Sequence, residues 1–156
     1  ICWVLEHVDC PVQVLNETKR LLKPMAPIYL REVFNTILFT DPPSPRLMQI
    51  WSEYNQKQIR MGGDPYVGAK IGLLLEQSGF DDVELKIQTQ VYDQRQPTAR
   101  LKMLNYWERL FLSGISHKII EEEFENLRSN LESIFCFGFA EAKATKPQVL
   151  RGLPEL

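Results

Sequence analysis

Apolar residues along the chain follow two alternating patterns: short continuous runs, which are typical of strands, and helical spacing of three or four positions. Residues 1–5 and 28–34 are mainly apolar runs and predict two strands, the first of them buried on both faces. Residues 11–23 between them have helical spacing and begin with a proline. A strand, a helix and a strand within about 35 residues predict a βαβ unit, in which the two strands are parallel.

The rest of the chain continues this alternation. Ser44 and Asp64 each precede a proline, which is a helix-start signal because the side chain caps the helix and proline fits its first turn. Gly62 and Gly63 end the first of these helices. The order predicts an α/β fold with at least four strands, in which a helical excursion separates the last two. The expected further helices begin at residues 45, 65, 99 and 116, and the expected further strands cover residues 83–87 and 134–140.

Composition narrows the classes of function. The 156 residues are 44% hydrophobic and 24% charged, the balance of one globular domain or a large part of one. A formal net charge of -2 argues against nucleic acid as a partner. No apolar run approaches the roughly 20 residues that cross a bilayer, so we expect no membrane span. Three sparse cysteines indicate reduced thiols in a cytoplasmic protein, and two histidines exclude a histidine-rich metal site.

The chain opens with the apolar residues Ile-Cys-Trp-Val-Leu, without a polar lead-in or the charged start of a signal peptide. This run predicts a buried strand, and a buried strand rarely begins a natural chain. The sequence is therefore interpreted as the second half of a longer protein.

Several segments together resemble one family in their order and spacing. Near the start they are residues 3–8 (Trp-Val-Leu-Glu-His-Val), 21–24 (Leu-Leu-Lys-Pro) and 28–30 (Ile-Tyr-Leu), followed by Glu32. Further along they are residues 62–68 (Gly-Gly-Asp-Pro-Tyr-Val-Gly), 73–75 (Leu-Leu-Leu) and 78–83 (Ser-Gly-Phe-Asp-Asp-Val). This series resembles the central region of class I S-adenosylmethionine-dependent methyltransferases, especially the small-molecule type related to quinone-biosynthesis enzymes.

The resemblance covers residues 1–91, and residues 134–144 resemble the antiparallel strand that closes the family's fold. It implies the second half of a Rossmann-like sheet, with three parallel strands, a final antiparallel strand and helical insertions. Residues 1–145 would be a partial domain without the N-terminal glycine-rich half that binds the cofactor, and residues 146–156 would be a tail. The acidic residue that binds the cofactor's ribose also has no counterpart, and Met25-Ala26 stands where the family has two glycines.

The resemblance also implies a site at the carboxyl ends of the parallel strands, where open α/β sheets bind their ligands. Leu5 and Glu6 would contact the cofactor, S-adenosylmethionine. The candidates for binding substrate are His7, Arg31, Glu32, Trp51, Tyr54 and Trp107.

Each candidate also has a purely structural interpretation. Glu6 could cap the adjacent helix, and His7 could be a solvated loop residue. Arg31 and Glu32 could form an ordinary ion pair on a rim. The aromatic residues could fill the interface between helix and sheet instead of forming a lid over an apolar acceptor. Trp3 is interpreted as a core residue.

The function that the resemblance implies is methyl transfer from S-adenosylmethionine to a small-molecule or lipid-like acceptor, by a longer enzyme that contains this chain. The expected partners are the acceptor and a second copy in a homodimer, with neither nucleic acid nor metal. No catalytic triad is required, because the sulfonium methyl is already electrophilic and the protein contributes mainly positioning. The alternative is a non-catalytic α/β interaction module derived from a methyltransferase.

Overall fold

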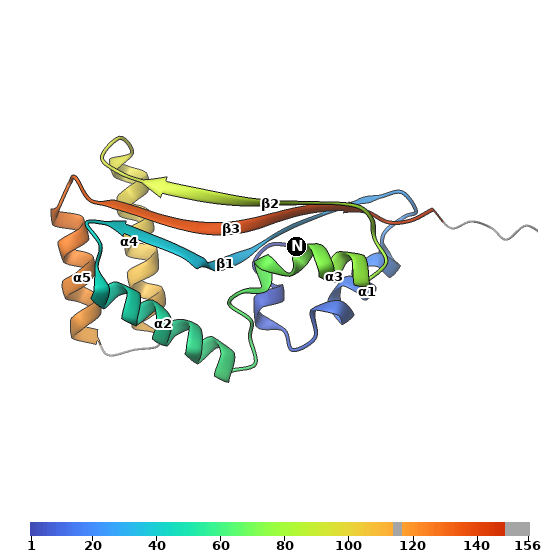
Figure 1. Ribbon diagram of the computed structural model, residues 1–156, viewed down its shortest axis with the longest axis horizontal. Helices are drawn as coiled ribbons and strands as arrows, with labels where there is room; N and C mark the ends of the chain where they lie inside the picture. Colours follow the sequence, from blue (N-terminus) through green and yellow to red (C-terminus); the bar gives the residue numbers. More distant parts are fainter. Residues whose placement is uncertain (114–116, 149–156) are drawn as a thin grey trace, which may run out of the picture.

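The computed structural model describes residues 1–113 and 117–148, so residues 149–156 of the predicted tail lie outside it. Its sheet has three strands in the order β1-β3-β2 (Figure 1). Both β1 and β2 pair with β3 in antiparallel register. The strands are β1 at Pro27–Asp41, β2 at Asp81–Tyr92 and β3 at Ile134–Thr145.

The expectation of three parallel strands closed by one antiparallel strand is wrong. The last strand, β3, inserts between β1 and β2, so each of them has an antiparallel neighbour although both run in the same direction. The pairing of strands far apart in the chain leaves no local pattern, so this order could not be predicted from spacing. The α/β class is correct, and a helical excursion does separate β2 from β3.

The first residues run alongside the outer edge of β1. The Trp3 backbone N–H donates to the Arg31 carbonyl over 2.9 Å, and a parallel bridge forms at Cys2. The prediction of a strand buried on both faces over residues 1–5 is wrong, since Trp3 and Val4 are 39% and 41% exposed. After the bridge the chain turns into a short 3-10 helix, η1, at Leu5–His7.

Helices begin where the sequence places caps and prolines in most cases. The Ser44 hydroxyl accepts a hydrogen bond from the Leu47 N–H over 3.0 Å and so caps the helix that starts at Pro45. The helix expected from residue 65 starts only at Ile71, after a second 3-10 helix, η2. The helical segments are α1 (Pro11–Leu21), α2 (Pro45–Arg60), η2 (Val67–Ala69), α3 (Ile71–Gln77), α4 (Pro97–Leu112) and α5 (His117–Ser129).

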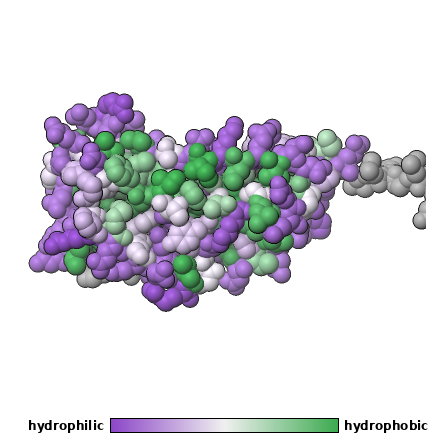
Figure 2. Space-filling view, in the orientation of Figure 1, coloured by the Kyte–Doolittle hydropathy of each residue, from purple (hydrophilic) through white to green (hydrophobic). Residues whose placement is uncertain are grey.

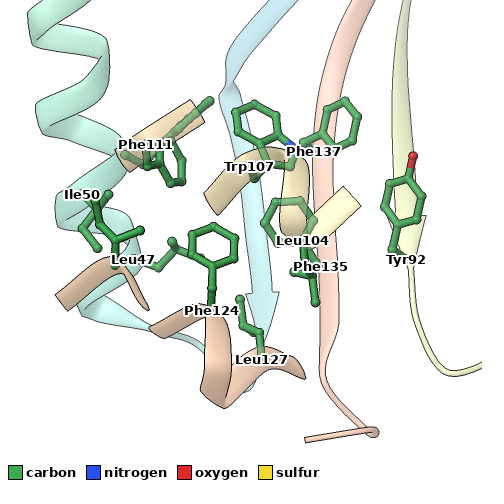
Figure 3. Close-up of a cluster of buried hydrophobic side chains, with 12 residues drawn as sticks. Leu47, Ile50, Tyr92, Leu104, Trp107, Phe111, Phe124, Leu127, Phe135 and Phe137 are labelled. Carbon is green, nitrogen blue, oxygen red and sulfur yellow. The ribbon is translucent and has the colours of Figure 1, made fainter. Parts of the chain in front are cut away.

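Two hydrophobic clusters use opposite faces of β3, because successive strand residues point to opposite faces. Phe135 and Phe137 enter the first cluster, which packs α2, α4 and α5 against the sheet (Figure 3). Ala140, Ala142 and Ala144 enter the second, which packs η1, α1 and α3. Figure 1 shows the two groups of helices toward the two ends of the sheet: α2, α4 and α5 toward one end, and α1 and α3 toward the other.

Strand β1 continues past its predicted end at residue 34 because it contains a bulge. Val33 lies opposite Phe139 and Leu38 opposite Phe137, so residues 34–37 face a single residue of β3. A bulge of this kind bends the strand and re-aims its side chains. Within this bulge, Asn35 forms hydrogen bonds with two residues of α2.

Hydrophobic side chains also reach the surface. Figure 2 shows a band of them along the sheet, bordered by hydrophilic side chains. On β2, Leu85, Ile87 and Val91 are between 37% and 44% exposed. Among the described residues, no helix combines the length and the apolar character needed to cross a membrane.

Candidate functional site

A cavity of about 220 Å³ opens where the start of the chain, the β1 bulge, α2 and α4 meet. The η1 turn supplies Glu6 and His7 to its wall. Trp51 and Tyr54 come from α2, and α4 contributes a second tryptophan and tyrosine. Phe139 of β3 adds a further ring. Segments far apart in the sequence therefore meet around one small space.

Aromatic rings form a large part of the cavity wall. Trp51 and Trp107 meet edge to face, with ring centroids 5.0 Å apart at an angle of 75°. Tyr54 stacks parallel to Trp51 at 5.7 Å, and Tyr106 stands at 78° to Trp107 at 5.8 Å. Such stacked and edge-to-face pairs stabilise defined ring orientations. The two tryptophans thus form a corner that a tyrosine extends on each side.

The β1 bulge holds α2 against this corner. The Trp51 Nε1–H donates to the Asn35 carbonyl over 2.7 Å, and the Asn35 amide donates to Asn55 Oδ1 over 2.8 Å. Both asparagines are buried, and leaving such a group unpaired costs about 1–3 kcal/mol. The bulge therefore fixes the orientation of the tryptophan.

One carboxylate closes the cavity at the η1 end. Glu6 is only 7% exposed, its Oε2 accepts a bond from Gln58 Nε2 over 2.8 Å, and its Oε1 lies 3.5 Å from His7 Nε2. The turn is also tied through its backbone, since the Glu6 carbonyl accepts a bond from the Asp64 N–H over 2.9 Å. An ionised carboxylate can accept about four hydrogen bonds, so this one retains unused capacity.

Both tyrosines of the wall stay neutral at ordinary pH. Burial raises the pKa of Tyr54 to about 12, with smaller contributions from the charges of Glu6 and Tyr106. Burial and, after it, the Glu6 charge also raise the pKa of Tyr106. The two phenol groups therefore remain O–H donors in the field of the Glu6 carboxylate.

Glu32 holds η1 in place without touching the cavity. Its side chain is fully buried, and its Oε1 accepts hydrogen bonds from the backbone N–H groups of Val4 and Leu5, each over 3.1 Å. N–H groups at the start of a helix have no partner within the helix. Burial raises the pKa of Glu32, against the lowering effect of these two bonds. Glu32 thus positions the turn that carries Glu6.

The predicted site residues divide into two groups. Leu5 is fully buried in the cluster around α1 and α3, and Glu32 lies beneath η1. Arg31 pairs with Glu141, with 2.9 Å between Nε and Oε1, and its guanidinium lies 4.7 Å from the centroid of the Phe139 ring. These three predicted residues lie outside the cavity, whereas its wall contains the other five: Glu6, His7, Trp51, Tyr54 and Trp107.

The observed contacts also bear on the purely structural interpretations of these residues. Arg31 pairs across the sheet and not with Glu32, because neighbouring strand residues point to opposite faces. Trp51 and Trp107 serve both purposes, since they belong to the core cluster and also line the cavity. The interpretation of Trp3 as a core residue is wrong, because it is exposed and lines the cavity.

Sequence reasoning did not select three residues that build the site. Phe139 belongs to an alternating series that indicates only a buried strand face. Asn35 does carry a signal, because asparagine is uncommon in strands and a buried one needs hydrogen-bond partners. Gln58 lies near the end of a largely polar helix, where nothing distinguishes it from its neighbours.

The described residues do not form a glycine-rich turn between a strand and a helix, the feature that holds the methionine part of the cofactor in the family that the sequence resembles. Gly62 and Gly63 follow the helix α2 instead. A Cβ built at Gly63 would lie 2.5 Å from the Glu6 carbonyl oxygen, so η1 fills this turn. The described residues around the cavity therefore do not supply this part of a cofactor site.

No protein-family model and no curated protein matches the sequence, but solved structures match the fold. A candidate methyltransferase of Bacillus halodurans C-125 is 15% identical with a TM-score of 0.54, over 94% of this chain and 68% of its own. Phosphoethanolamine N-methyltransferase 2 of Haemonchus contortus, solved with phosphomonomethylethanolamine and S-adenosylhomocysteine, is 13% identical with a TM-score of 0.50. That match covers 94% of this chain and only 32% of the enzyme. The chain therefore has a class I S-adenosylmethionine-dependent methyltransferase fold.

Proposed function

We propose that this chain forms the acceptor side of an S-adenosylmethionine-dependent methyltransferase that acts on a small molecule. The observation that carries the proposal is the cavity of about 220 Å³, walled by aromatic rings and closed by Glu6, within a methyltransferase fold. S-adenosylmethionine, when bound, supplies an electrophilic methyl group on its sulfonium. Because the described residues lack the glycine-rich turn, we expect a further segment or chain to hold most of the cofactor.

The side chains around the cavity have three tasks in this reaction. The aromatic wall excludes water and orients the acceptor, which is the contribution that methyl transfer needs most. Glu6 can accept a hydrogen bond or a proton at Oε1, to which no described residue donates. Tyr54 and Tyr106 can donate hydrogen bonds from phenol groups that stay protonated.

A label-transfer assay tests the proposal. The full-length protein that contains this chain is incubated with S-adenosylmethionine labelled in its methyl group and with fractions of a small-molecule extract. Label should appear in a small molecule that chromatography separates from the donor. Label that stays in the donor with every fraction, or that reaches only protein or nucleic acid, contradicts the proposal.

Replacing Glu6 by glutamine tests the site itself. Glutamine keeps the volume and can still bond to Gln58, but it removes the charge. If the carboxylate contacts the acceptor or the cofactor, turnover should fall by about tenfold or more, which is about 1.4 kcal/mol of transition-state stabilisation. The midpoint of thermal unfolding should shift little.

Glu53→Gln is the matched control, because Glu53 is an exposed carboxylate of α2 outside the cavity and bonds only to Gln49 among the described side chains. This variant should keep full turnover. A thermal midpoint that falls by several degrees in Glu6→Gln, with unchanged turnover per folded molecule, would show that Glu6 is a structural residue.

A further inference from the structure

The wall of the cavity is negatively charged. Glu6 is the carboxylate among the described residues of the wall, and none of these residues is a lysine or an arginine. His7 is the basic residue of the wall, and its side chain is 61% exposed, so solvent screens its charge when it is protonated. A wall of this kind attracts a cationic group and repels a phosphate or carboxylate.

Among the described residues, the Glu6 carboxylate has no buried cationic partner, and its one ion-pair contact is with the exposed His7, whose Nε2 lies 3.5 Å from Oε1. The one hydrogen bond to its side chain among the described residues comes from the neutral amide of Gln58. Burying a carboxylate costs free energy unless hydrogen bonds and an opposite charge compensate the loss of water. A cation seated beside Oε1 would supply both.

Four electron-rich rings surround the space next to this carboxylate. The faces of tryptophan and tyrosine attract a cation that lies within about 6 Å of the ring centroid. Trp51 and Trp107 meet at 75° and both line the cavity, so a ligand there would lie against both rings. Tyr54, Tyr106 and Glu6 line the same space, and the Glu6 charge is, after burial, a smaller cause of the raised pKa of both tyrosines.

We propose that the cavity binds the ammonium group of an amine, and that this amine is the methyl acceptor. For transfer the ammonium nitrogen gives a proton to Glu6 Oε1. The freed lone pair then forms the N–C bond to the methyl group, while the bond between methyl and sulfur breaks and leaves its electron pair on sulfur. The identification of the amine as acceptor rests on the proposed function, whereas the binding of an ammonium group does not. The volume of about 220 Å³ is below the roughly 300–1,000 Å³ of pockets that enclose whole drug-sized ligands. The cavity therefore takes a small charged head group, and any larger part of the acceptor lies outside it.

Choline and its neutral isostere 3,3-dimethylbutan-1-ol separate charge from shape, since they differ in one atom, a nitrogen in place of a carbon. Their binding to the full-length protein is measured by calorimetry in the absence of S-adenosylmethionine. Choline should bind about tenfold more tightly than the alcohol, because only the charged head interacts with the carboxylate and the ring faces.

Three variants test which residues cause the preference for choline over the alcohol. Glu6→Gln should remove most of it, and Tyr106→Leu should weaken choline several-fold by deleting one ring. Tyr106 is 41% exposed, so its replacement disturbs the core less than a change at either tryptophan. Glu53→Gln removes an exposed carboxylate outside the cavity and should leave both affinities unchanged.

Equal affinities for choline and the alcohol overturn the proposal, and so does a preference that survives both Glu6→Gln and Tyr106→Leu. A competition experiment distinguishes the two possible cations. If S-adenosylmethionine displaces choline and no complex with both forms, the cavity holds the donor's sulfonium and the amine assignment is wrong. Choline binding without any label transfer in the assay above contradicts the proposed function and leaves the ammonium site standing.

Discussion

Glu32 is fully buried, and one of its two carboxylate oxygens has no hydrogen-bond partner among the described residues. The other oxygen accepts the N–H groups of Val4 and Leu5. The start of the chain therefore satisfies these N–H groups through a side chain and not through a neighbouring strand. For this reason the apolar run turns into η1, and the position of Glu6 depends on a residue outside the cavity.

The pH dependence of the free energy of unfolding should reveal the raised pKa of Glu32. Burial raises its pKa above the ordinary value of 4.5, so the folded chain keeps a proton that the unfolded chain releases. The contribution of this group to the free energy of unfolding therefore falls as the pH rises through and above the ordinary value. Glu32→Gln keeps an oxygen that can accept both N–H groups but does not titrate.

Urea unfolding at about pH 4 and at about pH 7 checks this prediction. From about pH 4 to about pH 7, the free energy of unfolding of the wild-type protein should fall relative to that of Glu32→Gln. The fall should be about 1.4 kcal/mol for each unit by which the pKa of Glu32 is raised. Effects of the other carboxyl groups cancel in the comparison. A difference between the two proteins that stays constant with pH would show that Glu32 has an ordinary pKa.

At the level of elements, local chemistry predicted helix starts well and strand limits poorly. Ser44 followed by proline caps α2 because the signal lies within a few residues. The end of β1 was misplaced because Asn35 and Thr36 interrupt its apolar pattern, whereas a bulge lets the strand continue. The central place of β3 depends on pairing with two distant strands, which no window of sequence contains.

Two glycines of neighbouring elements should respond in opposite ways to alanine. A Cβ at Gly68 in η2 would overlap the Val33 carbonyl oxygen, so Gly68→Ala should destabilise the protein by about 1–3 kcal/mol. A Cβ at Gly72 in α3 would meet nothing closer than 3.5 Å, so Gly72→Ala should be neutral or stabilising by up to about 1 kcal/mol. Urea unfolding measures both, and equal effects would mean that η2 does not pack against β1 as described.

For the molecule as a whole, the sequence singled out residues of which five line one cavity, but it did not indicate the shape of that cavity. Glu6 was predicted because it follows an expected strand. Trp51 and Trp107 were predicted because they belong to helical segments rich in aromatic residues. The fold brings all three to one cavity. Leu5 and Arg31 lie as near in sequence, yet they point into a core and across the sheet. Which neighbours face a cavity depends on turns and bulges that tertiary contacts decide.

The 156-residue chain by itself should bind S-adenosylmethionine only weakly. Its described residues provide an aromatic cavity and one carboxylate. They do not provide the glycine-rich turn that lets the backbone approach the cofactor. They also lack the acidic residue that, in the resembled family, ends the second strand and binds the ribose. Calorimetry with S-adenosylmethionine and S-adenosylhomocysteine should therefore show no saturation up to about 1 mM. Choline, tested on the same sample, reports whether the cavity is formed. Low-micromolar binding of S-adenosylmethionine to the monomeric chain would show that these residues suffice to hold the cofactor, and the assignment of the chain to the acceptor side alone would be wrong.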